Sequence, residues 1–218
     1  MTLAIFDLDN TLLAGDSDHA WGEFLVDAEL VDPESHRQQN DQFYQDYLNG
    51  ELDVYRYQRF ALSPIAGRDP EEVAAWRKAF MNSRIKPLYQ RKADTLLASH
   101  RDRGHTLMII TATNRFVTGP IAEAMGIEHL LATEPEVVDS RYTGDIVGVP
   151  TYQDGKVVRL REWLEEHGES LEGAWFYSDS HNDLPLLKLV DNPVAVDPDP
   201  TLEQYARDQG WPVMSLRD

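Results

Sequence analysis

Short apolar runs that end in polar or small residues constrain the fold of this chain more than any other feature. Four such runs occur, LAIF (3–6), LMII (107–110), AWFY (174–177) and PVAV (193–196). Each is too short for a helix and is typical of a buried strand in a parallel sheet. Helical patterns lie between or after them, over residues 86–103, 118–125, 156–167 and 201–208. This alternation predicts a doubly wound α/β fold with a Rossmann-like parallel sheet.

One long segment interrupts the alternation. From residue 16 to residue 84 the chain has no convincing strand and carries amphipathic stretches such as HAWGEFLVDAEL (19–30) and PEEVAAWRKAF (70–80). We therefore expect an α/β core domain of residues 1–15 and 85–218, with residues 16–84 inserted after the first strand as a helical cap domain. The β-forming residues around Gly144, within 140–152, predict a small β-hairpin flap.

Charge and composition limit the partners of the protein. The 218 residues carry 20 basic and 38 acidic side chains, a formal charge of −18, which repels nucleic acid and anionic membranes. We expect neither as a partner, and a bound phosphate would need a local cation. The absence of cysteine excludes disulfides and thiolate chemistry. Because the first residues do not resemble a signal peptide and no apolar run is long enough to span a membrane, we expect a cytoplasmic protein, either a monomer or a homodimer.

Polar side chains follow three of the predicted strands directly. Asp7 and Asp9 follow the first, Thr111 follows the second, and Asp179 and Asp183 follow the third. The carboxyl ends of parallel strands form the ligand-binding edge of such a sheet, so these groups are expected to meet. Four converging carboxylates repel one another unless a cation lies between them, and carboxylate oxygens without sulfur suit Mg²⁺. Taken singly, the same acids are also compatible with an acidic turn or helix N-caps.

Two further residues suit a phosphate group. The Thr111 hydroxyl and the amides that follow it are able to bind phosphate oxygens, although a buried threonine often satisfies a backbone carbonyl instead. Lys156 begins a predicted helix and is placed to reach the strand ends, although an isolated lysine there is commonly a solvated surface residue. A phosphate site in so acidic a protein requires a fixed positive charge of this kind.

The joint pattern resembles a known family. The set Asp7-x-Asp9-x-Thr11-Leu12, Thr111, Lys156 and Asp179-x-x-x-Asp183 is similar, in order and context, to the four motifs of the haloacid dehalogenase superfamily of phosphatases. The similarity spans nearly the whole chain, and the inserted helices resemble the cap of its phosphoserine phosphatase-like branch. The resemblance implies a Mg²⁺-dependent phosphomonoesterase that forms an aspartyl-phosphate.

The resemblance also implies a role for each residue. Asp7 would be the nucleophile and Asp9 the general acid and base. Thr111 would bind the phosphoryl group, and Lys156 would neutralise charge. Mg²⁺ would be held by the Asp7 carboxylate, the Asp9 backbone carbonyl and Asp179, with support from Asp183. The remaining contacts to phosphate or substrate would come from Ala112, Thr113 and Asn182.

The substrate is expected to be a small phosphorylated metabolite, and the resemblance suggests one that bears an amine. In phosphoserine phosphatases a cap acid nine positions after the nucleophile contacts the substrate amine, and a cap arginine takes its carboxylate. Asp16 and Arg59 stand at the corresponding places here. The second motif reads Thr111-Ala112-Thr113 rather than the usual Ser-Gly-Gly, and we expect either a phosphoserine-like ester or histidinol phosphate. A helix N-cap at Asp16 and a surface ion pair at Arg59 are the alternative interpretations.

Two other classes of protein share parts of this pattern. Receiver modules of signalling proteins combine an acidic pocket with a threonine and a lysine on a doubly wound sheet, and they hold a phospho-aspartate without turnover. They are typically about half this length and lack a helical insertion. A catalytically silent binding protein would keep the fold alone, whereas every expected catalytic position is filled here. An acid at Asp9, where the ion-pumping members have threonine, favours rapid hydrolysis.

Overall fold

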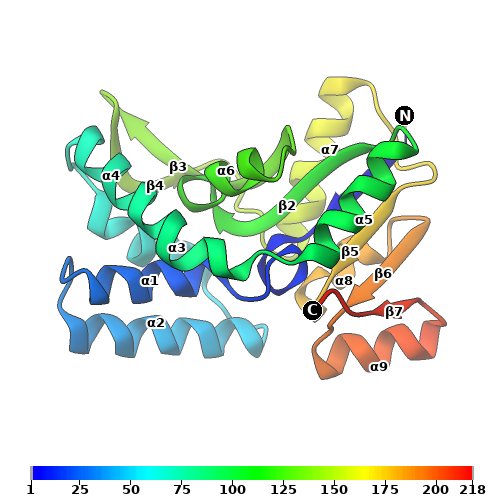
Figure 1. Cartoon of the computed structure of the whole chain (residues 1–218), viewed down its shortest axis with the longest axis horizontal. Coiled ribbons are helices and arrows are strands. Elements are labelled where there is room, and N and C mark those ends of the chain that lie inside the picture. The colour runs from blue at the N-terminus through cyan, green and yellow to red at the C-terminus, as the bar shows by residue number, and fades with distance from the viewer. Residues whose placement is uncertain (1, 218) are drawn as a thin grey trace.

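The four predicted apolar runs lie next to one another in a single sheet. The structure is a computed structural model that describes residues 2–217, and its seven-stranded sheet has the order β4-β3-β2-β1-β5-β6-β7 (Figure 1). All neighbouring strands are parallel, with the exception of the β3–β4 pair. The strands are β1 (Leu3–Phe6), β2 (Thr106–Asn114), β3 (His129–Val138), β4 (Arg141–Val147), β5 (Trp175–Ser178), β6 (Asn192–Val196) and β7 (Val213–Met214). The predicted doubly wound α/β fold is confirmed.

Alternate residues of the buried strands pack on opposite faces of the sheet. In β1, Ala4 and Phe6 belong to one apolar cluster, and Leu3 and Ile5 belong to the other. Helices α5 (Arg91–Asp102) and α6 (Arg115–Ala124) cover the first face, whereas the second is covered by α7 (Asp154–His167), α8 (Leu184–Leu187) and α9 (Pro200–Gln209). Because both faces are covered, the central strands contain the continuous apolar runs that made them predictable.

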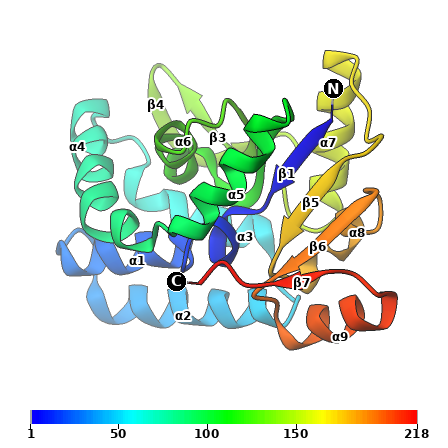
Figure 2. The ribbon, with the colours of Figure 1, turned by 45° about the vertical axis from the view of Figure 1, so that its right-hand side comes forward.

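Four helices lie between β1 and α5, in the segment of residues 16–84 for which the sequence predicts helices. They are α1 (Ser17–Asp27), α2 (Pro33–Leu48), α3 (Val54–Leu62) and α4 (Pro70–Phe80). Figures 1 and 2 show them grouped at the end of the sheet toward which β1 runs. An aspartate caps the first turn of each helix through its side chain: Asp16, Asp32, Asp53 and Asp69. Short helical turns complete the segment: 63–65, 81–85 and 86–88.

The inserted helices share an apolar cluster with the sheet. The ring of Trp21 on α1 packs at 5.1 Å from Phe116 on α6 and at 5.2 Å from Phe80 on α4. Both neighbours are buried members of the cluster that includes Phe6 of β1. The helices are therefore seated on the core by buried aromatic contacts. The division into core and cap domains at residues 15/16 and 84/85 stays a prediction.

The predicted hairpin is displaced toward the N-terminus. It consists of β3 and β4 with a turn at Asp139 and Ser140, whose positive φ angles of 50° and 63° suit a tight two-residue hairpin turn. Residues 148–152, the last part of the segment in which we expected the hairpin, contain no strand. Sequence analysis missed β3 because its apolar first half, HLLA, runs directly into the exposed residues of the hairpin. The hairpin contacts the inserted segment, where the Gly67 amide donates to the Tyr142 carbonyl at 2.8 Å.

Candidate active site

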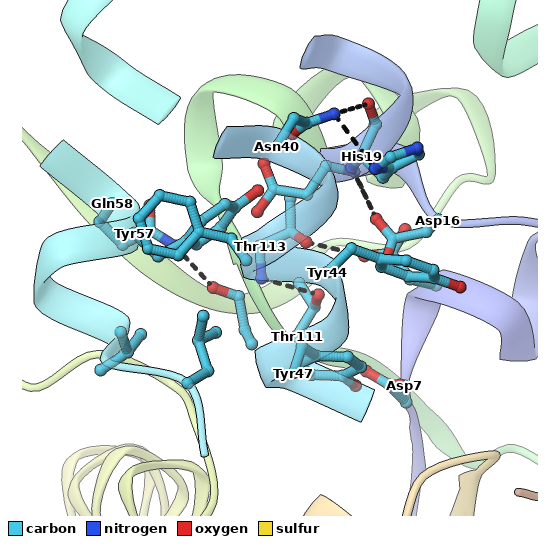
Figure 3. A pocket seen from close by; sticks show the side chains of 16 residues that line it. Asp7, Asp16, His19, Asn40, Tyr44, Tyr47, Tyr57, Gln58, Thr111 and Thr113 are labelled. Carbon is cyan, nitrogen blue, oxygen red and sulfur yellow. Dashed lines mark hydrogen bonds between the residues drawn. The ribbon is translucent and has the colours of Figure 1, made fainter. Parts of the chain in front are cut away.

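A cavity of about 50 Å³ opens between the carboxyl ends of β1 and β2 and helices α1, α2 and α3 (Figure 3). The sheet contributes the polar residues of the predicted motifs, and the helices contribute acids, amides and aromatic rings. Its walls are formed by Asp7, Asp9, Asp16, Asp18, His19, Asn40, Phe43, Tyr44, Tyr47, Leu52, Val54, Tyr57, Gln58, Thr111, Ala112 and Thr113.

Asp7 is held at the end of β1 by an ion pair. The Lys156 ammonium donates to Asp7 Oδ1 at 2.9 Å and to Asp183 Oδ2 at 2.8 Å, and all three side chains are buried. The Ser178 hydroxyl donates to the same Asp183 oxygen at 2.6 Å. Lys156 is therefore a buried residue and not a solvated surface lysine. It lies in the first turn of α7, and its ammonium joins a carboxylate that follows β1 to one that follows β5. The second carboxylate oxygen of Asp7 is left to face the cavity.

The charges of this group are interdependent. Burial raises the pKa of Asp7 to about 7, an effect that the Lys156 ammonium opposes and the Asp183 and Asp9 charges increase. Burial also acts to lower the pKa of Lys156, but the carboxylates of Asp183 and Asp7 outweigh it and leave that pKa above its ordinary value. Lys156 therefore remains a cation and supplies one positive charge to two carboxylates.

Asp9 is anchored by both the sheet and the insertion. Its Oδ1 accepts from the Ser17 amide at 2.6 Å, and its Oδ2 accepts from the Thr113 hydroxyl at 2.7 Å. Burial raises its pKa to about 7, and the nearby Asp16 charge adds to the rise, whereas the hydrogen bonds oppose it. A carboxyl group with a pKa near neutrality is able both to give and to accept a proton at physiological pH.

The end of β2 presents a hydroxyl and a short backbone segment to the cavity. The Thr111 hydroxyl accepts from the Thr113 amide at 3.2 Å, so its own proton stays available to a ligand oxygen. Two backbone carbonyls of this segment already accept hydrogen bonds. The Thr151 hydroxyl donates to the Thr111 carbonyl at 2.6 Å, and the Thr133 hydroxyl donates to the Ala112 carbonyl at 2.9 Å. These bonds fix residues 111–113 in the cavity wall.

Asp179 stands beside this group at the end of β5. Its Oδ1 accepts from the Thr11 hydroxyl at 3.1 Å, and its amide donates to the same hydroxyl at 3.0 Å. Burial raises its pKa well above the ordinary value, and the charges of Asp7 and Asp183 raise it further. The pair of Asp7 and Asp179 therefore lacks a counter-charge beyond Lys156.

This donor set fits magnesium. Within residues 2–217, no three of the His, Asp or Glu side chains form a ready-made metal site by themselves. Mg²⁺ is commonly held by one or two carboxylates together with water and a substrate phosphate, rather than by a complete protein cage. Asp7 and Asp179 supply two such carboxylates, and the excess of negative charge around them is what a divalent cation would balance.

Asp16 is the helix N-cap that the sequence offered as one interpretation, and its contact with substrate stays a prediction. Its Oδ1 accepts from the Asp18 and His19 amides at 2.9 and 2.8 Å, so it is the N-cap of α1. It also lines the cavity, as Figure 3 shows. One of its oxygens is thus committed to the helix.

Two predicted substrate residues are not brought to the cavity. Arg59 lies on the exposed side of α3, with its side chain 60% accessible and 3.9 Å from Asp145, so the surface ion pair is the arrangement that forms. Asn182 is buried, but its Nδ2 donates to the Tyr47 carbonyl at 3.0 Å and its Oδ1 accepts from Tyr152 and Gln153. It joins α2 to the core and does not line the cavity.

Sequence analysis missed the groups that the insertion adds. The acid Asp18 and the polar residues His19, Asn40, Tyr57 and Gln58 all line the cavity. Asp18 stands two positions after Asp16, in the first turn of a helix that begins at Ser17, and both acids line the cavity. The others come from α1, α2 and α3, and no motif in the sequence relates them to the strand ends.

Comparison with known proteins agrees with this geometry. Residues 4–188 match the family model described as haloacid dehalogenase-like hydrolase. A histidinol-phosphatase of Neisseria meningitidis serogroup C is 44% identical over 219 residues, which cover 99% of both chains. A solved structure of a protein with unknown function from Bordetella pertussis Tohama I has a TM-score of 0.92 and 43% identity, and covers 99% of this chain and 100% of its own. A phosphoserine phosphatase structure, a phospho-aspartyl intermediate analogue, has a TM-score of 0.72 at 18% identity over 99% of this chain and 93% of its own, a likeness of fold alone.

An α/β fold with buried acids, a lysine and a threonine at its strand ends defines a class of phosphoryl-transfer proteins. The chain belongs to the haloacid dehalogenase-like hydrolases, and the family predicted from its motifs is confirmed. Its relatives within that family indicate a phosphoric monoester hydrolase, the enzyme class that the sequence predicts. No helix within residues 2–217 is long and apolar enough to cross a membrane.

Proposed function

We propose that this hydrolase is a Mg²⁺-dependent phosphomonoesterase that forms an aspartyl-phosphate on Asp7 and acts on a small amine-bearing phosphorylated metabolite. The observation that carries the proposal is the buried Asp7 carboxylate, which is fixed by Lys156 at 2.9 Å and lies in the same cavity as Asp9 and Thr111. The proposed nucleophile, the proposed proton carrier and a hydroxyl that is able to donate a hydrogen bond to phosphate thus line one cavity. The remainder of the family motifs surrounds them.

The geometry supports a two-step displacement. The free oxygen of Asp7 attacks phosphorus, the bond from phosphorus to the ester oxygen breaks, and Asp9 gives its proton to the departing alkoxide. Asp9 then takes a proton from water as the water oxygen attacks phosphorus. The bond between phosphorus and Asp7 breaks, which releases phosphate and restores the carboxylate.

The other residues hold charge in place during both steps. Lys156 neutralises part of the negative charge on Asp7 and the phosphoryl group, and the Thr111 hydroxyl donates to a phosphoryl oxygen. Asp7 and Asp179 would hold Mg²⁺, assisted by the Asp9 carbonyl, with Asp183 supporting Lys156. When bound, this cation supplies further neutralisation of the phosphoryl oxygens.

Histidinol phosphate is the first substrate candidate and a phosphoserine-like ester is the second. The first is supported by the name of the relative that is 44% identical over nearly the whole chain. Acidic residues of the insertion, Asp16 among them, face the cavity and favour a cationic group on the substrate. We further propose that residues 16–84 act as a cap over the core of residues 1–15 and 85–218.

The test is phosphate release from a panel of esters, which includes histidinol phosphate, phosphoserine, sugar phosphates and nucleotides. Each ester is assayed with Mg²⁺ and with EDTA, and Asp7→Asn is the control variant. We expect metal-dependent release with one preferred ester and none from the variant. Release by Asp7→Asn would overturn the proposed nucleophile. A stable phosphoprotein without phosphate release would instead indicate a signalling module.

A further inference from the structure

Asp18 is a buried acid in the cavity that the proposed reaction does not use. It lies in the first turn of α1 and is 7% exposed. Its Oδ1 has no hydrogen-bond partner in the structure. An ionised carboxylate in this condition has lost its hydration without a full replacement, which is unfavourable unless a donor arrives from outside the protein.

A second unpartnered acceptor belongs to another residue that lines the cavity. Gln58 on α3 is 1% exposed, and its Nε2 donates to the Ala112 carbonyl at 3.3 Å. Its Oε1, like Asp18 Oδ1, is buried without a partner. Both residues line the cavity, so the insertion presents two acceptors and calls for a ligand that carries donors.

The charge of the cavity has one sign. Its walls include the four acids Asp7, Asp9, Asp16 and Asp18, and none of the described residues that line it is a lysine or an arginine. Burial and the charges of Asp16 and Asp9 raise the pKa of Asp18 well above its ordinary value, and the hydroxyls of Tyr57 and Thr113 oppose the rise. A positive group on a ligand would relieve this repulsion.

Asp16 is less suited than Asp18 to receive that group. One Asp16 oxygen already accepts two amide hydrogens of α1 as the helix cap. Asp18 is not a capping residue and keeps Oδ1 free. Asp16 therefore caps the helix, and Asp18 is the acid that remains available to a ligand.

We infer that Asp18 binds the ammonium group of the substrate and that the substrate carries no carboxylate near it, which makes it an amino-alcohol phosphate rather than an amino-acid phosphate. The inference rests on the proposed function and specifies its substrate class. An ammonium donates to Asp18, and a further donor of the substrate binds Gln58. A carboxylate has acceptors only, and it would meet four acids here with no lining cation to balance it.

The experiment compares three esters that differ by one group. Phosphoethanolamine is an amino-alcohol phosphate, propyl phosphate replaces its ammonium by a methyl group of similar size, and phosphoserine adds a carboxylate to it. With Mg²⁺ present, we expect the wild-type kcat/KM for phosphoethanolamine to exceed that for each of the other two by about tenfold or more. A wild-type protein that prefers phosphoserine, or that does not distinguish the ammonium from the methyl group, would overturn the inference.

Asp18→Asn then tests the residue itself. We expect its kcat/KM for phosphoethanolamine to fall about tenfold, mainly through KM because the ammonium is remote from the reacting phosphorus, while propyl phosphate changes less than about threefold. Glu51→Gln, at an exposed position between α2 and α3, removes one negative charge of the insertion and controls for its general field. Asp18→Ser serves as a second variant if the first does not fold.

The outcomes separate the two proposals. Equal loss on phosphoethanolamine and propyl phosphate would show a structural role for Asp18 and overturn the inference, while the phosphatase function would stand. An equal loss in Glu51→Gln would also overturn it, because the effect would then be the field of the insertion. Turnover of no ester by the wild-type protein, including histidinol phosphate, would overturn both.

Discussion

Removal of the buried lysine provides a severe test of how the strand ends are held together. Lys156→Met keeps the length and apolar character of the side-chain stem and deletes the ammonium that bridges Asp7 and Asp183. All three side chains are no more than 5% exposed, so water cannot take the place of the lost cation without opening the core.

The magnitude follows from this burial. Loss of one partner from a buried ion pair costs about 3–5 kcal/mol, because the remaining charge stays uncompensated. In this chain two carboxylates lose their partner, so we expect a decrease near the upper end, about 5 kcal/mol in the free energy of unfolding. For a domain of this size each kcal/mol corresponds to about 2–4 °C in the midpoint of thermal unfolding.

The assay is urea unfolding of the metal-free protein at neutral pH, followed by circular dichroism. The double variant Lys156→Met/Asp183→Asn removes one of the two stranded charges, so it should recover about half of the lost stability while remaining inactive. A Lys156→Met protein within about 1 kcal/mol of the wild type would refute the reasoning, as would a double variant less stable than the single one.

Three further predictions address other parts of the structure. Thr113→Val deletes the hydroxyl that donates to Asp9, so the pKa of Asp9 should rise and the alkaline limb of kcat/KM should move to higher pH by about half a unit or more, whereas Thr113→Ser should leave the profile in place. Burial, and then the charges of His105 and Arg103, lower the pKa of His100 to about 4, so this histidine is neutral in the folded protein. Its contribution to stability is fully present above the unfolded pKa of about 6.5 and is lost as the pH falls below it. As the pH falls from about 6.5 to 5, the wild type should therefore lose about 2 kcal/mol more unfolding free energy than His100→Gln, and parallel curves would contradict this. Gly155→Ala would place a Cβ atom 2.0 Å from the Pro150 carbonyl, so it should displace Lys156 and lower phosphatase activity. Gly168→Ala, at the other end of α7, should lower activity less, because its added Cβ atom meets open space and the only strain comes from the positive φ of 65°.

The residues at the strand ends were predictable because their positions depend on short-range rules. Asp7, Thr111 and Asp179 each follow a buried apolar run, and parallel pairing of those runs brings their carboxyl ends together regardless of the connections between them. Lys156 was harder to place, but the demand of an acidic protein for a cation at a phosphate site singled it out. In the structure Asp7 and Thr111 line the cavity, Lys156 donates to Asp7, and the charge of Asp7 acts on Asp179.

The substrate-binding residues were less predictable because a position in the sequence does not determine which way a side chain faces. Arg59 lies at a plausible distance along the chain, yet on α3 it faces solvent while its neighbour Gln58 faces the cavity. Asn182 has the right chemistry for a phosphate, but its amide is consumed by the carbonyl at the end of α2. Both outcomes depend on how the helices pack, which no local pattern encodes.

The first turn of α1 explains why the insertion begins where it does. Its free amides bind two acids of the cavity: Ser17 donates to Asp9, and the next two amides donate to Asp16. A helix N-terminus stabilises negative charge, so the start of the insertion lowers the cost of placing these acids so close to Asp7. The same turn carries Asp18, whose free oxygen is left without such help. One helix end thus binds the proposed proton carrier, Asp9, and leaves Asp18 Oδ1 without a partner. This is the arrangement expected if substrate binding and proton transfer depend on the same turn.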